Sequence, residues 1–154
     1  MNIFDHPQIK FHPNEGDTLA TSGVDSLINL FDLGSSNEDD ALCQTLTTSS
    51  SVRNLRWFPQ TSSPLSNGSS LSSTKDTSSP RDVTNWTQLA AVTANEDLEL
   101  WDRCGVQAWK TFTRADIAAA IKRLSVDHAY VADVHPMGPS GELLVIAGSK
   151  SRER

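Results

Sequence analysis

The side chains best suited to bind a metal ion are four histidines and two cysteines: His6, His12, His128, His135, Cys43 and Cys104. None of them forms the close pairs that are typical of zinc sites, and two distant cysteines do not make a disulfide framework. His12 and His135 each precede a proline, which favours a structural position at the end of a strand. We therefore predict no metal site and interpret both cysteines as ordinary core or sheet-edge residues.

The motifs of common catalytic sites do not occur in the sequence. There is no glycine-rich phosphate loop, no nucleophile elbow and no zinc-protease motif. Adjacent carboxylates at positions 39–40 and 96–97 stand in segments of turn composition, where solvated side chains are far commoner than acid–base pairs. The sequence predicts a protein that is not an enzyme and that uses no cofactor.

The overall charge restricts the classes of partner. Thirteen Lys and Arg residues against 19 Asp and Glu residues give a net charge of -6, which disfavours binding to nucleic acid or to an acidic membrane surface. No stretch approaches the ~20 apolar residues that span a bilayer, and the first residues do not resemble a secretory signal. We expect an intracellular protein, in the cytoplasm or nucleus, whose partners are other proteins.

An internal repeat organises the chain. Residues 19–32 align without gaps on residues 89–102, an offset of 70, and residues 9–13 align on residues 55–59, an offset of 46. The difference of 24 residues marks an insertion, and its removal leaves a repeat of 46 residues. A third, incomplete copy follows at residues 129–149.

Each copy has the pattern of a short antiparallel meander. The first strand ends at Pro13, because proline donates no ladder hydrogen bond. A strand at residues 19–23 follows, then a tight turn in which Asp25 can accept hydrogen bonds from nearby amides. The return strand at residues 27–32 has apolar residues on both faces, as expected for a strand between two neighbouring sheets.

Each full copy closes with an aromatic residue followed by aspartate. The turn residue and the closing pair of the two copies are Asp25, Phe31 and Asp32, then Asn95, Trp101 and Asp102. The closing pairs resemble the Trp-Asp dipeptide of the WD repeat, whose length of ~40 to 45 residues is close to the period found here. The chain is similar to WD-repeat β-propellers.

This resemblance implies an all-β fold, a partial WD-repeat β-propeller of two and a half four-stranded antiparallel blades with one disordered loop and one short inserted helix. Blade one is expected at about residues 9–46, blade two at 52–112 and an incomplete blade three at 129–149. The chain departs from the family where Thr48 and Ser125 replace the expected histidine. The buried polar network of the family should therefore be partial, with blades held mainly by apolar packing.

The implied function is a non-catalytic protein-interaction scaffold. Partners are expected at the loops of residues 14–17, 24–26 and 94–97. Two alternatives stay open, a substrate-recruiting subunit of a cullin-type ubiquitin ligase and an accessory subunit of an enzyme complex. The ligase motif places arginine two positions after Trp-Asp, whereas Arg103 follows Asp102 directly.

Two insertions interrupt the repeat. Between residues 60 and 85, 13 of 26 residues are Ser or Thr, which predicts a disordered loop because so little apolar surface is available for burial. Within it, Ser63 and Ser79 precede prolines and match proline-directed phosphorylation sites. The second insertion, residues 113–125, predicts an amphipathic helix that covers the propeller rim or binds a partner. Its capping pair and apolar stripe are Thr113, Asp116, Ile117, Ala120, Ile121 and Leu124.

The four tryptophans divide into two pairs. Trp57 and Trp101 occupy repeat positions, so we expect them in the core. Trp86 and Trp109 stand at the margins of the copies, and either is a candidate contact for a partner because exposed tryptophans are frequent anchors in interfaces.

The chain supplies fewer than three of the ~4 to 8 blades of a propeller. An open arc leaves two apolar faces bare, and at about 25 cal/mol per Å² a face of ~400 Å² corresponds to ~10 kcal/mol. That is as large as the ~5 to 15 kcal/mol net stability of a whole domain. We therefore expect the chain to be a fragment that self-associates or packs loosely when expressed alone.

Overall fold

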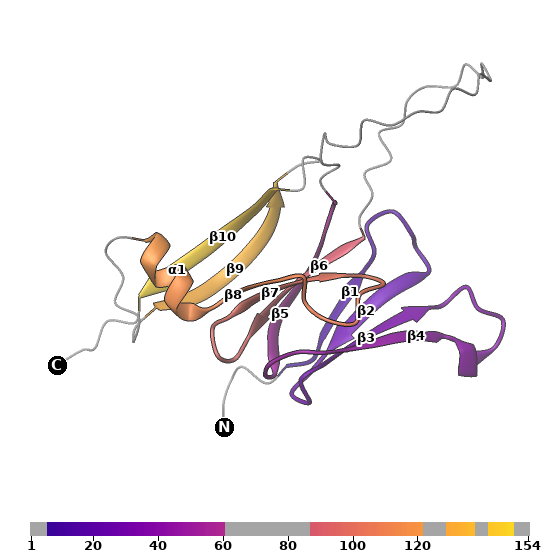
Figure 1. The fold of residues 1–154 in the computed structure, drawn as a ribbon. Coiled ribbons are helices and arrows are strands. Elements are labelled where there is room, and N and C mark those ends of the chain that lie inside the picture. Colours follow the sequence, from indigo (N-terminus) through magenta and orange to yellow (C-terminus); the bar gives the residue numbers. More distant parts are fainter. Residues whose placement is uncertain (1–5, 61–86, 122–128, 138–141, 150–154) are drawn as a thin grey trace, which may run out of the picture.

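A computed structural model describes residues 6–60, 87–121, 129–137 and 142–149 (Figure 1). The segment at 61–86, which holds Ser63, Ser79 and Trp86, lies outside the described residues, as do Leu124 and Ser125. The predictions made for those residues therefore stay predictions.

The described residues form three antiparallel sheets that follow one another along the chain, each in simple meander order. The first sheet contains β1 (Gln8–Phe11), β2 (Thr18–Ser22), β3 (Leu27–Asp32) and β4 (Leu42–Thr47). The second contains β5 (Val52–Phe58), β6 (Gln88–Thr93), β7 (Leu98–Asp102) and β8 (Lys110–Phe112), and the third contains β9 (Ala129–Met137) and β10 (Glu142–Ser149). A short 3-10 turn, η1 (Glu38–Asp40), precedes β4. This architecture confirms the predicted all-β fold class.

The strand registers carry the offsets found in the sequence. All five residue pairs between β2 and β3 recur between β6 and β7 with 70 added to every residue number. The pairing of Ile9 with Thr21 likewise recurs as Leu55 with Ala91, so the first strands are related by 46. The first strands also lie side by side, with β5 in contact with both β1 and β9. The sheets are therefore stacked in equivalent orientations around their first strands.

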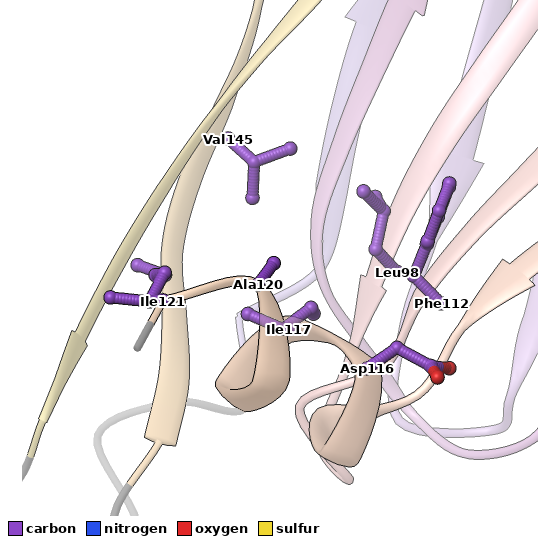
Figure 2. Close-up of a pocket in the computed structure, with 8 residues that line it drawn as sticks. Leu98, Phe112, Asp116, Ile117, Ala120, Ile121 and Val145 are labelled. Carbon is purple, nitrogen blue, oxygen red and sulfur yellow. The ribbon is translucent and has the colours of Figure 1, made fainter. Parts of the chain in front are cut away.

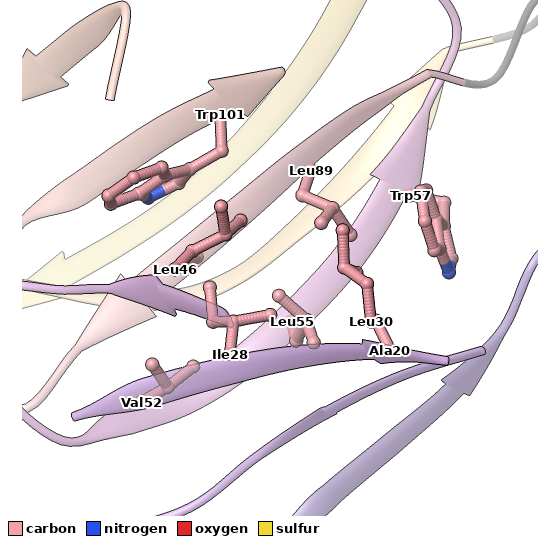
Figure 3. Packing of buried hydrophobic residues seen from close by; sticks show 10 residues of the cluster. Ala20, Ile28, Leu30, Leu46, Val52, Leu55, Trp57, Leu89 and Trp101 are labelled. Atoms are coloured by element: carbon pink, nitrogen blue, oxygen red, sulfur yellow. The ribbon is translucent and has the colours of Figure 1, made fainter. Parts of the chain in front are cut away.

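The first core fills the space between the first and second sheets (Figure 3). Trp57 and Trp101 are buried there, as predicted. Full burial of one large aliphatic side chain contributes about 1.5 to 3 kcal/mol, so this interface is a major source of stability. Its buried residues are Ala20, Ile28, Leu30, Leu46, Val52, Leu55, Trp57, Leu89, Ala91 and Trp101.

The second core lies between the second and third sheets. Its buried residues are Phe58, Ala90, Val92, Leu98, Leu100, Ile117, Val131 and Val134. Successive side chains of a strand point to opposite faces, so β6 contributes Leu89 and Ala91 to the first core but Ala90 and Val92 to the second. The second sheet is consequently covered on both faces.

The helix α1 (Arg114–Ala120) is shorter than predicted. The expected capping box is present, with Thr113 and Asp116 each accepting a hydrogen bond from the other's backbone amide. The helix ends at Ile121, whose extended backbone (φ -104°, ψ 90°) cannot continue it. Ile117 and Ala118 are buried, whereas the predicted stripe members Ala120 and Ile121 are exposed. The middle residues of the helix therefore pack against the sheets, whereas its last turn is exposed to solvent.

The interpretation of the cysteines as core or edge residues is only half correct. Cys43 lies on the edge strand β4 and Cys104 in the loop after β7, and both are exposed free thiols. Neither contributes to a core. The apolar character of cysteine suggested burial, but both positions lie at the periphery of the sheets, where no part of the described chain covers them.

Among the residues that the structure describes, the first sheet buries only one of its faces. A row of apolar residues crosses the other face, where cross-strand pairing links Phe11, Leu19, Phe31 and Leu42. Phe11 and Leu42 are exposed and the other two are half-buried. The equivalent row of the second sheet contains Trp57, Leu89 and Trp101, all buried against the first sheet. The bare face of the first sheet is thus of the kind that another sheet normally covers.

Because this row is apolar and solvent-exposed, we expect the purified chain to self-associate as its concentration rises. Replacement of Phe11 and Leu42 together by serine should shift the population toward monomer in sedimentation velocity. Serine at Val24 and Leu33, which are equally exposed but lie outside the strands, is the matched control and should have little effect. A monodisperse monomer for the unmodified chain at high concentration would contradict this reading.

Candidate functional site

The loops at the two ends of the sheets form separate surfaces. In an antiparallel meander successive turns alternate between ends, so residues 14–17, between β1 and β2, lie at the opposite end from residues 24–26, between β2 and β3. Residues 94–97 lie at the same end as 24–26, and there the Asp97 carboxylate accepts a hydrogen bond at 2.9 Å from the backbone amide of Arg114 in α1. The three loops predicted to bind partners therefore do not share one surface. We call the end with 24–26, 94–97 and α1 the helix end.

Glu96 was expected in a solvated carboxylate pair, and that expectation is wrong. Its side chain accepts hydrogen bonds from Arg53 Nη1 at 2.6 Å and from the backbone amide of Val131 at 3.1 Å, and the residue is only 4% exposed. Arg53 Nη2 also donates to the Val131 carbonyl at 3.0 Å. The Glu96 backbone is left-handed (φ 68°), as is that of its repeat counterpart Ser26 (φ 62°). This turn geometry aims the carboxylate back at β9 and joins the second sheet to the third.

A second buried carboxylate, that of Glu99, was missed by sequence reasoning. It accepts hydrogen bonds from the Trp101 indole nitrogen at 3.2 Å and from the backbone amide of Ser49 at 3.0 Å, and the residue is 3% exposed. Thr48, which stands where the family places histidine, binds the backbone carbonyl of Ser26 instead. Glu99 therefore binds the Trp101 indole nitrogen, which in a typical repeat belongs to a network that contains the histidine. The signal in the sequence was a carboxylate flanked on both faces of the strand by the apolar residues Leu98, Leu100 and Trp101.

The signature residues of the repeat mainly shape turns. Asp32 and Asp102 each accept a hydrogen bond at 2.9 Å from the backbone amide two residues further on, which fixes the turn after the third strand in both copies. Asp25 does the same in its own turn at 3.1 Å. Asn95 is exposed, and Phe31 is half-buried in the apolar row of the first sheet. These positions therefore support the fold.

An apolar groove opens at the helix end between α1 and the second and third sheets (Figure 2). It has a volume of about 250 Å³, and Asp116 supplies the one charged side chain of its lining. A hydrogen bond with Thr113 is the main reason that the pKa of this carboxyl lies below its ordinary value. The lining residues are Leu98, Phe112, Asp116, Ile117, Ala120, Ile121, Val145 and Ala147.

Trp109, one of the two predicted contact tryptophans, is 52% exposed. Its backbone amide donates to the Leu100 carbonyl at 2.9 Å, so the main chain is fixed while the indole faces solvent. A tryptophan held in this way is a suitable anchor for a partner, because little conformational entropy is lost when it is covered.

Polar contacts at the opposite end join the first and second sheets. Arg103 donates to the Glu15 carboxylate at 2.7 Å, and Gln44 donates to the Gly105 carbonyl at 2.6 Å. The hydrogen bond from Arg103 is the main reason that the pKa of the Glu15 carboxyl lies below its ordinary value.

Nearer the first strands, Asn54 donates a hydrogen bond to Asp133, and Arg56 forms an ion pair with the same carboxylate at 3.6 Å. Burial, the largest single influence, raises the pKa of Asp133. Hydrogen bonds from Asn54 and from the backbone amide of Val134, together with the charge of Arg56, outweigh it and leave the pKa lowered.

Comparison with known proteins supports the fold. No family model matches the chain. Among solved structures, the chain is similar to Chaetomium thermophilum Sqt1, in a crystal structure of Sqt1 bound to the N-terminus of ribosomal protein L10, with a TM-score of 0.54 and 15% sequence identity. The chain has the fold of a partial WD-repeat β-propeller. The match covers 90% of this chain and 29% of that Sqt1 chain, so the three sheets correspond to blades that make up under a third of its length.

Two observations bear on other site classes. Within the described residues, no three His, Cys, Asp or Glu side chains come together as a metal ion would need. His12 is buried in a T-shaped contact with the Trp57 ring, and its Nδ1 accepts a hydrogen bond from the Glu15 backbone amide at 2.9 Å. His135 is exposed. In the described part of the chain, no helix is both long and apolar enough to cross a bilayer.

Removal of the Glu99 carboxyl should destabilise the propeller. Glu99→Ala leaves the buried Trp101 indole without its acceptor, at a cost of about 1 to 3 kcal/mol, whereas Glu99→Gln keeps an acceptor oxygen and should cost less. Urea denaturation followed by tryptophan fluorescence measures both losses. Asp39→Ala, at an exposed acid, should leave the midpoint unchanged, and equal midpoints for Glu99→Ala and this control would refute the role of Glu99.

The Glu15–Arg103 contact should respond to pH. Because the folded-state pKa of Glu15 is lowered, the contact adds stability above the unfolded pKa of glutamate, and this is lost as the pH falls through the lower folded value. Arg103→Gln should raise the Glu15 pKa toward its ordinary value in an NMR titration of the side-chain carboxyl. The pKa of Asp116, which Thr113 controls, should stay unchanged and serves as the internal control.

Proposed function

We propose that this chain is part of a non-catalytic protein-interaction scaffold, and that the groove at the helix end is one of its contact surfaces. The groove carries the proposal because it is apolar, open to solvent and walled by fixed elements: two sheets and a capped helix. Exposed apolar patches rimmed by polar residues are typical of sites that bind other proteins.

The size of the groove favours a protein partner over a small metabolite. Pockets for small ligands usually measure ~300 to 1,000 Å³, and the groove, at about 250 Å³, lies below that range. It suits one large side chain of a partner, with neighbouring residues of that partner resting on the surrounding surface. Sqt1 bound to the N-terminus of ribosomal protein L10 is an example of a protein of similar fold that holds a segment of another protein.

Trp109 is proposed as a second contact, on the basis of its exposed indole. We also propose that the protein acts inside the cell. Within the WD-repeat family, the segments at residues 9–13, 19–32 and 89–102 resemble WD repeat-containing protein 89, and we propose a relationship to it. The ubiquitin-ligase alternative gains no support, because Arg103 follows Asp102 directly and does not stand at the position of the motif arginine.

A charge placed in the groove should weaken partner capture without unfolding the chain. Ala120 lines the groove, while the neighbouring Ala119 is exposed on the same helix but does not line it. With the tagged protein in cells, Ala120→Glu should reduce the specifically co-purifying proteins at least tenfold, because burial of an unpaired carboxylate is costly, and quantitative mass spectrometry measures this. Ala119→Glu is the matched control and should leave capture unchanged.

The same assay tests Trp109. Trp109→Ala should lower capture while the circular dichroism and melting temperature stay unchanged, since the indole is half exposed. Unfolding of this variant would show instead that Trp109 is part of the core. If a protein that carries both Ala120→Glu and Trp109→Ala still captured its partners in full, the proposed function would be wrong.

A further inference from the structure

We propose that Cys43 and Cys104 form a reversible disulfide bond under oxidation, and that this bond joins the first sheet to the second. The inference goes beyond the proposed function, because it involves neither the groove nor Trp109. The two cysteines are far apart in the sequence, and the fold brings them to the same place.

One cavity has both cysteines in its lining. It lies where the first sheet meets the loop after β7, has a volume of about 220 Å³ and also touches Leu30 and Arg103. Both cysteines are exposed free thiols, so a small oxidant can reach them from solvent. The two sheets that carry them each contain four strands, and the cavity therefore belongs to the interface between two full copies of the repeat.

A β-bulge sets the position of Cys43. The residues of β4 that pair with β3 pass from Gln44 directly to Leu42, so Cys43 between them has no partner on β3. A bulge bends its strand and turns a side chain out of the regular alternation. Cys43 and Gln44, which regular alternation would place on opposite faces, therefore both line the cavity.

A turn held by hydrogen bonds sets the position of Cys104. Its backbone amide donates to the Asp102 carboxylate at 2.9 Å, and the amide of the following residue donates to the Asp102 carbonyl at 2.9 Å. In the first copy, Asp32 fixes Gly34 in the same way. The second copy thus carries a thiol where the first copy has no side chain.

One hydrogen bond holds the two cysteine segments together. Gln44 Nε2 donates to the Gly105 carbonyl at 2.6 Å. These two residues directly follow Cys43 and Cys104 in the sequence, so the contact brings the backbone of each cysteine close to that of the other.

A second contact acts on the other side of Cys104. Arg103, which precedes it, forms an ion pair at 2.7 Å with Glu15 in the loop between β1 and β2. The residues on both sides of Cys104 are therefore bound to the first sheet and its loops. A disulfide forms only where two Cα atoms approach within about 7 Å, and these contacts hold the two segments in such an approach.

Hydrogen peroxide is the proposed oxidant. The thiolate of one cysteine attacks a peroxide oxygen, so that an S–O bond forms, the O–O bond breaks and hydroxide leaves and takes up a proton. The other thiolate then attacks the sulfur of this sulfenic acid, so that the S–S bond forms, the S–O bond breaks and a second water is released. The two sulfurs together lose two electrons, which the peroxide gains. A cellular thiol such as glutathione reverses the reaction by thiol–disulfide exchange.

The bond is a response to oxidation and not a permanent staple. Disulfides inside cells are usually transient and redox-sensing. This bond closes the chain between positions 43 and 104 and so restricts the unfolded state. Oxidation therefore makes the contact between the first two sheets harder to open.

Peptide mapping tests the bond. The full 154-residue chain is reduced, freed of reductant and exposed at low concentration to hydrogen peroxide, and the remaining thiols are blocked with N-ethylmaleimide. Trypsin without reductant should then release residues 11–53 joined to residues 104–110, the peptides that hold Cys43 and Cys104. In a mixture of isotope-labelled and unlabelled chains, each joined pair should carry one label throughout, because the bond forms within one molecule. It should form at least tenfold faster in buffer than in urea, where the fold no longer holds the thiols together.

A displaced thiol is the matched control. Cys43→Ser combined with Thr45→Cys keeps an exposed thiol on β4 at a position that does not line the cavity, and its bond to Cys104 should form at least tenfold more slowly. Oxidation of the unmodified chain should raise its midpoint in urea, and Cys43→Ser should abolish this rise. The inference is wrong if the folded chain yields no joined peptides, or if the joined peptides carry mixed labels. Equal rates in buffer and urea, equal rates for the displaced thiol, or a midpoint that oxidation leaves unchanged would also overturn it.

Discussion

The packing of one sheet's apolar face against the next is the interaction on which this protein depends. Trp57, Leu89 and Trp101 of the second sheet cover Ile28 and Leu46 of the first, and this contact fixes how the sheets are stacked. A single four-stranded sheet with apolar residues on both faces is not stable on its own in water, because each face must be buried against another element. Within the described residues, the second sheet packs against a neighbour on both faces, although its face toward the third sheet is only partly covered, and the first sheet packs on one face only.

Two buried carboxylates make this packing specific. Glu99 accepts a hydrogen bond from the Ser49 amide in the segment that follows β4, and Glu96 together with Arg53 satisfies both the amide and the carbonyl of Val131 on the third sheet. An apolar interface alone tolerates sliding, whereas a buried donor that loses its acceptor costs free energy. These hydrogen bonds therefore fix the register of the sheets, and they do so with residues other than the histidine and aspartate expected of a WD repeat.

The same packing creates the groove. The second sheet presents a full set of four strands to the third, but β9 and β10 cover only part of it, and α1 occupies part of the remainder. The short helix is fixed at its start by the Thr113–Asp116 capping box and by Asp97. Its open last turn leaves Ala120 and Ile121 beside Leu98 and Val145. A binding surface thus arises where the repeat is interrupted, and the interaction role proposed here depends on that interruption.

The sequence by itself determined the features that are local or periodic. The offsets of 70 and 46, the positions of the strands, the capping of α1 and the burial of Trp57 and Trp101 all follow from side-chain alternation and turn chemistry within short segments. Tertiary structure decided the rest. Glu96 is buried because Arg53 and Val131, 43 and 35 residues away, converge on it. The cysteines are exposed because no sheet of the described residues covers their positions. The groove likewise exists only because three separate elements meet around it. Such features depend on which distant groups share a site, and a linear pattern of residue types does not contain that information.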